Sequence, residues 1–363
     1  MRWLERFKTW LDGRRAGAPP RTAARPAARA AAAHPEEHAL VLQLALQGGG
    51  AHGAFTWGVL DRLLDEADFS CPRISGTSAG ALNGAVLVSG YAAGGRAGAQ
   101  RALAELWEAV SEIGALFAPL QAQRAFLAKG FGAGFDAFDA FMRLWSPAQL
   151  NPFDLNPLRD VLERQVNLDA LRHCPDIRLH VCATNVTTGE PRVFSGEDLS
   201  IAALLASACL PFLFRAVEID GVPYWDGGYA GNPVLAPLID GASRDDGRDV
   251  LLIQINPQAR VGAPTTASDI MHRVNEITFN ASLLAELRAI ELLGERIESA
   301  RPAIRLHRIG MHDGATQAEP AGKASVNSSF FHSLRDQGRT AAAAWLAAHR
   351  LAVGRVGTMK QQA

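Results

Sequence analysis

The sequence of 363 residues predicts an α/β fold with three layers, in which a mostly parallel central sheet lies between two layers of helices (α/β/α). The first observation is a near-continuous apolar run over residues 39–47, which is typical of a strand buried on both faces. The second is that helical periodicity begins after Gly53, so that strand, glycine turn and helix make the opening unit of a parallel sheet. The third is that apolar strand segments and amphipathic helices continue to alternate along the chain.

The later elements follow the same alternation. Further strands are expected at residues 73–75, 177–183, 250–255 and 303–307. Helices are expected at residues 78–91, 101–113, 158–165, 270–299 and 333–349. Two further segments, Ala216 to Asp220 and Val222 to Tyr224, form a strand-like pair around Gly221.

The chain divides by composition into a terminal arm and one large body. Near the N-terminus, apolar residues recur at helical spacing with charged residues between them: Trp3, Leu4, Phe7, Trp10 and Leu11. An Ala/Pro/Arg-rich run follows and cannot join a core, because it has no apolar side chain larger than alanine. We expect residues 1–38 to be a flexible basic amphipathic helix with its linker, residues 39–350 to be a single domain, and residues 351–363 to be a flexible tail.

Two interpretations of the arm stay open. Its aromatic face and its arginines favour an anchor to a membrane or a lipid-granule surface. Alternatively, the arm is a disordered extension whose helix docks weakly on the body, because a helix this short is marginal alone.

Composition excludes several classes of protein. The formal net charge is −1 and 20% of residues are charged, so nothing in the body indicates a nucleic-acid partner. The four cysteines have no C-x-x-C spacing, which favours reduced thiols and a cytoplasmic location, peripheral at a membrane if the arm is an anchor. No apolar stretch reaches the ~18 residues of a membrane span. We expect no metal and no cofactor.

A glycine-rich turn, Gly48-Gly49-Gly50-Ala51-His52-Gly53, follows the first strand. Its G-x-G-x-x-G spacing also fits a dinucleotide-binding turn, but the next strand runs into another motif and does not end in the acidic residue that would bind a ribose. We favour an oxyanion hole, in which closely approaching glycine N–H groups and a helix N-terminus stabilise negative charge. A purely structural turn explains one or two of these glycines more easily than four.

The second motif is a nucleophile elbow, Gly76-Thr77-Ser78-Ala79-Gly80, between a short strand and a helix. Such an elbow exposes a serine hydroxyl on a sharp turn, and the flanking glycines relieve crowding. The alternative is an ordinary helix N-cap at Thr77 or Ser78.

The third motif is the loop Asp226-Gly227-Gly228, in which two glycines keep the backbone close and would let the carboxylate reach Ser78. The alternative is a simple Asp-Gly turn. A late histidine could complete a Ser-Asp-His triad instead, and His312-Asp313-Gly314 is the segment that could be proposed for it.

These three motifs, in this order, resemble the patatin-like phospholipase family over roughly Leu40 to Ile255. The resemblance implies an α/β/α fold and a Ser–Asp dyad without a catalytic histidine. Ser78 would be the nucleophile, Asp226 the base, and the N–H groups around Gly49, Gly50 and Ala51 the oxyanion donors. Family members often carry Arg or Lys where this chain has His52, so a permanent positive charge beside the turn is in doubt.

The sequence therefore predicts a serine acyl-ester hydrolase of lipids, similar to phospholipase A or a lysophospholipase, that works through an acyl-enzyme. Its partner would be a lipid or another acyl ester. Two alternatives remain: a catalytically silent lipid-binding or scaffold protein, and an esterase of another water-poor ester such as a storage polyester. A dinucleotide-dependent oxidoreductase ranks third.

Overall fold

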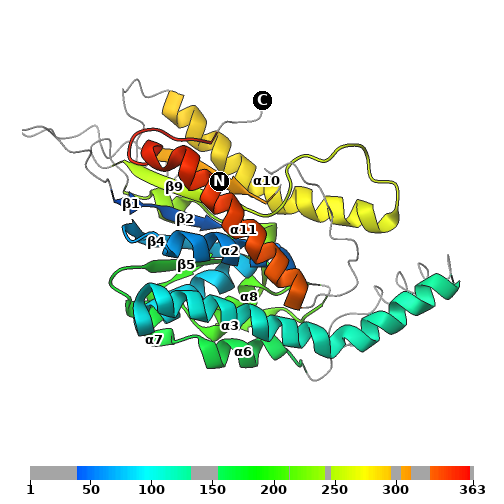
Figure 1. Ribbon diagram of the computed structural model, residues 1–363. Coiled ribbons are helices and arrows are strands. Elements are labelled where there is room, and N and C mark those ends of the chain that lie inside the picture. Colours follow the sequence, from blue (N-terminus) through cyan, green and yellow to red (C-terminus); the bar gives the residue numbers. More distant parts are fainter. Residues whose placement is uncertain are drawn as a thin grey trace, which may run out of the picture. The chain divides into compact units, whose positions relative to one another are not determined.

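The computed structural model describes residues 39–131, 154–211, 213–241, 247–295, 304–311 and 328–359 (Figure 1). The predictions for the arm, residues 1–38, and for His312-Asp313-Gly314 lie outside these residues.

The described residues form a mixed sheet of eight strands, most of them parallel. Five parallel strands run in the order β10 (Ile304–Gly310), β9 (Arg248–Gln254), β2 (Gln43–Leu46), β4 (Arg73–Thr77) and β5 (Arg178–Asn185). Three antiparallel strands extend it: β6 (Pro191–Ser195) and β8 (Val222–Asp226) pair with β5, and β7 (Val217–Ile219) pairs with β8. A separate parallel pair joins β1 (Leu40–Val41) to β3 (Phe69–Ser70).

The helices confirm the predicted alternation and add short elements that the sequence did not indicate. The α-helices are α2 (Gly53–Leu64), α3 (Ala79–Phe131), α6 (Pro157–Gln165), α7 (Leu168–His173), α8 (Ile201–Ser207), α9 (Ala236–Ile239), α10 (Ala267–Glu295) and α11 (Ser328–His349). Short 3-10 turns are η1 (Gly50–His52), η2 (Gly196–Asp198), η3 (Gly227–Tyr229) and η4 (Arg350–Ala352). The two helices expected at 78–91 and 101–113 are halves of α3, which breaks at Gly94 and Gly95.

Alternating side chains of β4 show that helices cover both faces of the sheet. Gly84 of α3 lies against Ile74, so α3 and its neighbours α2 and α11 pack on that face. In Figure 1, α2 and α11 cover the face turned to the reader. Ser75 points the other way, and its hydroxyl donates to the Val234 carbonyl at 2.6 Å, just before α9. The α/β/α expectation is thereby confirmed.

The chain after α11 stays bound to the sheet. Thr358 N–H and Met359 N–H both donate to the Leu306 carbonyl of β10, at 2.9 and 3.0 Å. Val353 is buried, and His307 of β10 hydrogen-bonds the Thr358 hydroxyl at 2.9 Å. Within the segment that the sequence predicts to be a flexible tail, main-chain hydrogen bonds thus join residues 358 and 359 to an edge strand.

Candidate active site

Ser78 lies on a strained elbow between β4 and α3. Its φ is 54°, a conformation that costs a non-glycine residue on the order of 1–3 kcal/mol. A Cβ at Gly76 would lie 2.7 Å from the Gly80 carbonyl oxygen, and one at Gly80 would collide with the Leu46 carbonyl, so the tight turn requires both glycines. The Ser78 N–H donates to Ser207 Oγ at 2.9 Å.

Strand register brings Asp226 to this elbow. Thr77, the last residue of β4, pairs with Cys182, whereas Asp226, the last residue of β8, pairs with the next β5 residue, Ala183. Both β5 residues also pair with β6, which takes the other edge of β5. Strands β4 and β8 therefore lie along the same edge of β5, and their ends meet there. Ser78 directly follows β4 and Asp226 ends β8, so the two residues reach this point from opposite directions.

Asp226 is fully buried and its backbone is held on both sides. Its N–H donates to the Cys209 carbonyl at 2.7 Å, and its carbonyl accepts from Thr184 Oγ1 at 2.8 Å. Gly228 N–H donates to Oδ1 at 2.7 Å, whereas Oδ2 has no well-formed hydrogen bond within the described residues.

Burial raises the pKa of Asp226 to about 7, because the charged form loses water. The Gly228 N–H and the nearby Ser78 hydroxyl oppose this shift, since each favours the ionised carboxylate. An exposed aspartate, by contrast, has an ordinary pKa near 4. At neutral pH the side chain therefore exchanges a proton readily.

The glycine turn packs directly on the serine. A Cβ at Gly48 would lie 2.7 Å from the Ser78 Cβ. Asn232 binds both sides of the Gly48 residue: its Oδ1 accepts the Gly48 N–H at 2.6 Å and its Nδ2 donates to the carbonyl at 3.2 Å. Asn256 Nδ2 donates to the same carbonyl at 2.6 Å. The turn is thus fixed by side chains from two other loops.

These bonds narrow the predicted oxyanion set. Gly48 N–H is used by Asn232, His52 N–H donates to the Gly49 carbonyl at 3.3 Å, and Gly53 N–H donates back into η1. The N–H groups of Gly49, Gly50 and Ala51 remain, and they have no acceptor among the described residues. Gly50 has a φ of 59°, a backbone conformation that favours glycine. Three of the six residues can therefore donate to a ligand.

Sequence reasoning missed the polar residues that position this site. Ser207 Oγ accepts the Ser78 N–H and donates to the Cys182 carbonyl at 2.6 Å. Gln47 Oε1 accepts the N–H groups of Ile255 and Asn256, at 2.9 and 2.8 Å. A buried amide at the end of an apolar strand was a usable signal for Gln47, whereas Ser207 stands in an ordinary helical segment.

Two of the described histidines make contacts other than with the Ser78–Asp226 pair. His307 is buried, but it binds Asp249 Oδ1 at 2.9 Å and Thr358. His52 is exposed beside the turn, and its ring centroid lies 6.5 Å from that of Phe330.

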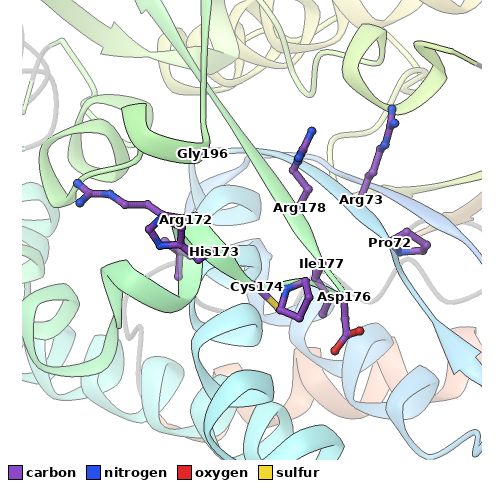
Figure 2. A pocket seen from close by; sticks show the side chains of 11 residues that line it. Pro72, Arg73, Arg172, His173, Cys174, Asp176, Ile177, Arg178 and Gly196 are labelled. Carbon is purple, nitrogen blue, oxygen red and sulfur yellow. The ribbon is translucent and has the colours of Figure 1, made fainter.

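A cavity of about 510 Å³ opens at the opposite edge of the sheet (Figure 2). Arg73 and Arg178, which begin β4 and β5, line it, so the length of these strands separates it from Ser78. The Arg172 side chain points away from both (Figure 2), so the cations do not converge on a ligand.

In the part of the chain that the structure describes, no cluster of three or more His, Cys, Asp or Glu side chains could hold a metal ion. Nor is any helix in that part long and apolar enough to cross a bilayer.

A helix-covered sheet with a serine on a strand-to-helix elbow, beside a glycine turn, is the architecture of an α/β serine hydrolase. The family model of patatin-like phospholipases matches residues 44–239, and the chain belongs to this family.

No curated protein sequence matches the chain significantly. Among solved structures, VipD from Legionella pneumophila is 14% identical with a TM-score of 0.38, over 85% of this chain and 67% of its own. The type III effector protein ExoU is 15% identical with a TM-score of 0.30, over 86% of this chain and 53% of its own. The chain spans about half the length of ExoU, and at these TM-scores we draw nothing from either protein about substrate.

Proposed function

We propose that this protein hydrolyses carboxylic esters of lipids, as a phospholipase A or lysophospholipase does, through a Ser78–Asp226 dyad and an acyl-enzyme. The observation that carries the proposal is the end-to-end meeting of β4 and β8, with a strained serine beside a buried carboxylate whose Oδ2 has no well-formed hydrogen bond within the described residues. Family membership supports the reaction class.

In the first half-reaction, Ser78 Oγ bonds to the ester carbonyl carbon while its proton moves to Asp226 Oδ2. The carbonyl oxygen becomes an oxyanion that the N–H groups of Gly49, Gly50 and Ala51 stabilise. The C–O bond to the alcohol then breaks, and the alcohol leaves with the proton from Asp226. Ser78 now carries the acyl group.

In the second half-reaction, water gives a proton to Asp226 as its oxygen attacks the acyl carbon. The bond to Ser78 Oγ breaks, and Oγ recovers the proton. The net change is ester plus water to carboxylic acid plus alcohol. Because the base must be ionised to accept each proton, we expect kcat/KM to fall as pH drops below about 7, the raised pKa of Asp226.

The dyad is tested by Ser78→Ala and Asp226→Asn, with turnover of a p-nitrophenyl acyl ester and fatty-acid release from lysophospholipid as measurements. We expect each variant to lose about 10³-fold or more in kcat, because both groups act in one step. A fluorophosphonate probe should label the parent but not Ser78→Ala.

Matched controls are Ser70→Ala and Asp176→Asn, two exposed positions away from the elbow, which should keep full activity. Full activity in either dyad variant would reject the mechanism. Lipid binding without turnover or labelling in the parent would favour the silent scaffold, and turnover confined to a polyester would favour the storage-ester alternative.

The arm, residues 1–38, supports a second part of the proposal, because its aromatic and basic residues suit an anionic lipid surface. We expect deletion of residues 1–34 to leave turnover of a soluble ester intact and to weaken binding to anionic vesicles in a flotation assay. Equal vesicle binding with and without the arm would contradict the anchor.

A further inference from the structure

One peptide group of the glycine turn is held by two amide side chains. The Gly48 carbonyl accepts from Asn256 Nδ2 at 2.6 Å and from Asn232 Nδ2 at 3.2 Å. This carbonyl shares a peptide plane with the Gly49 N–H, which has no acceptor among the described residues. The peptide bond is trans, so the carbonyl and the N–H point in opposite directions. Fixing the carbonyl on one side therefore aims the Gly49 N–H toward the other.

The same two hydrogen bonds make the Gly49 N–H a stronger donor. Hydrogen bonds to a carbonyl oxygen draw electron density out of the peptide group, so its N–H becomes more positive. A donor that is already aimed and polarised stabilises an oxyanion without reorienting during the reaction. A Cβ at Gly49 would lie 2.8 Å from Ile255 Cδ1 and 3.2 Å from Asn256 Oδ1. The segment that carries Asn256 therefore packs directly against this donor.

Asn256 is itself held by a chain of amides that ends on α10. Gln47 Oε1 accepts the N–H groups of Ile255 and Asn256, at 2.9 and 2.8 Å. Gln47 Nε2 donates to Asn280 Oδ1 at 2.9 Å, and Asn280 Nδ2 donates to the Pro257 carbonyl at 3.1 Å. Gln47 is 0% exposed and Asn280 is 3% exposed. Loss of one partner would therefore leave a buried polar group unpaired.

The orientation of each amide in this chain is fixed by its neighbours. An amide side chain can turn over and exchange its donor and acceptor ends. The Pro257 carbonyl can only accept, so Asn280 must present Nδ2 to it and Oδ1 to Gln47. Gln47 then presents Oε1 to two backbone N–H groups, which can only donate. No flipped arrangement pairs every group, so the segment that carries Asn256 has one hydrogen-bonded position.

We propose that Asn256 is a positioning residue for the oxyanion donor at Gly49, and that Asn280 holds Asn256 in place through Gln47. Because this donor acts only when Ser78 attacks an ester, the catalytic consequence rests on the proposed function. The orientation of the peptide group does not rest on it and can be measured without turnover.

The first test compares Asn256→Leu and Asn280→Leu in the full chain. Leucine is close to asparagine in size but has no donor or acceptor. Loss of a whole oxyanion donor costs about 10²–10³-fold in kcat, so we expect the misdirected donor in Asn256→Leu to cost about 10-fold. KM for a soluble p-nitrophenyl ester should change less than ~2-fold, since this interaction is made in the transition state.

A double variant and a matched control complete the kinetic test. Asn256→Leu/Asn280→Leu should lose no more than Asn256→Leu alone, because the two residues act in one chain. Asn167→Leu makes the same substitution at the start of α7, where Asn167 Oδ1 accepts the Ala170 N–H at 3.1 Å. Helix α7 lines the cavity at the opposite edge of the sheet, so this variant should keep kcat within ~2-fold of the parent.

A second measurement needs no turnover. The ¹³C resonance of the Gly48 carbonyl, observed by NMR in protein made with labelled glycine, reports hydrogen bonding to that oxygen. We expect this resonance to move upfield in Asn256→Leu and in Asn280→Leu, and to stay in place in Asn167→Leu.

An unmoved carbonyl resonance in Asn256→Leu would overturn the proposal, and so would a change in KM alone. A double variant that loses markedly more than Asn256→Leu would reject the link through Asn280. A moved resonance alongside a parent without activity would keep the positioning role and reject the hydrolase. An active parent with an unmoved resonance would do the reverse. Thermal unfolding checks that the variants fold; if Asn256→Leu does not, Asn256→Ala, which also removes the donor, replaces it.

Discussion

At the scale of single residues, the chemistry of the candidate site depends on how the backbone restrains two side chains. Ser78 keeps a positive φ because Ser207 holds its N–H and because glycines leave room on either side. Asp226 keeps its position because Cys209 and Thr184 bind both sides of its backbone. These contacts offset the elbow strain of about 1–3 kcal/mol. They also leave the two side chains little freedom.

The raised pKa of Asp226 makes a stability prediction. The folded protein holds this proton up to about pH 7, whereas an unfolded aspartate releases it near pH 4. The group therefore adds stability below about pH 4 that is lost as pH rises through about 7. We expect Asp226→Asn to be more stable than the parent at about pH 8, by roughly 1–4 kcal/mol, and equal to it near pH 4.

Urea denaturation at several pH values measures this difference. Glu286, whose pKa burial raises to about 7, is present in both proteins and cancels in the comparison. If the difference in unfolding free energy between the parent and Asp226→Asn does not change with pH, Asp226 is not buried as a charge at high pH.

At the scale of elements, the contact between α2 and α11 fixes where the glycine turn points, because α2 begins directly after η1. The two helix backbones touch. A Cβ at Gly58 would collide with the Arg335 carbonyl, and one at Gly338 would collide with the Phe55 carbonyl. Glycine is required at both positions by close approach.

This contact predicts whether Gly338→Ala raises or lowers the free energy of unfolding. Helix propensity alone would favour alanine by about 1 kcal/mol. The steric conflict is with backbone, which cannot rotate away, so we expect a net loss of at least ~2–3 kcal/mol in the free energy of unfolding. The control Ala343→Ser adds one heavy atom at an exposed position of the same helix and should change stability by less than ~0.5 kcal/mol. A stabilised Gly338→Ala protein would show that the helices can separate freely.

Sequence periodicity predicted the long elements well and the short ones poorly. The segment expected at 158–165 is α6 at Pro157–Gln165, and the strand expected at 177–183 is β5 at Arg178–Asn185. By contrast, β6, α7 and α8 were not predicted. Each of these elements is short, so the preferences of its own residues contribute little to its conformation. Pairing or packing with β5 and α3 decides that conformation.

At the scale of the whole molecule, one buried charge network joins the sheet to the C-terminal segment. Asp249 of β9 binds Arg305 at 2.7 Å and His307 at 2.9 Å, both on β10, and accepts the Gly354 N–H at 3.1 Å. Burial by itself would raise the pKa of Asp249, but the hydrogen bonds from His307, Arg305 and Gly354 together outweigh it and lower the pKa. The carboxylate therefore links two strands and the tail.

Removing this charge should loosen the edge of the molecule. We expect Asp249→Asn to lose about 3–5 kcal/mol at neutral pH, since Arg305 would keep a buried charge without its counter-ion. Because the folded pKa is lowered, the parent's advantage exists above about pH 4 and disappears as pH falls through the folded pKa.

Urea denaturation gives the energy, and hydrogen exchange at Gly354 and Thr358 reports release of the tail. The exposed Asp176→Asn serves as control and should stay within ~0.5 kcal/mol of the parent. Unchanged hydrogen exchange at these two residues would mean that the main-chain hydrogen bonds to Leu306 are enough to hold the C-terminal segment in place.

The residue types of the candidate site were set by the sequence alone, because a glycine turn, an elbow serine and an Asp-Gly loop each need particular side chains at particular spacing. The alternation of strand and helix likewise follows from local apolar periodicity. Only the tertiary structure decided that β4 and β8 end against each other on β5, that three of six turn residues have N–H groups left to donate, and that Asp226 is buried enough to titrate near neutral pH. Strand register, hydrogen-bond partners and desolvation depend on residues far apart in the chain, and no local pattern encodes them.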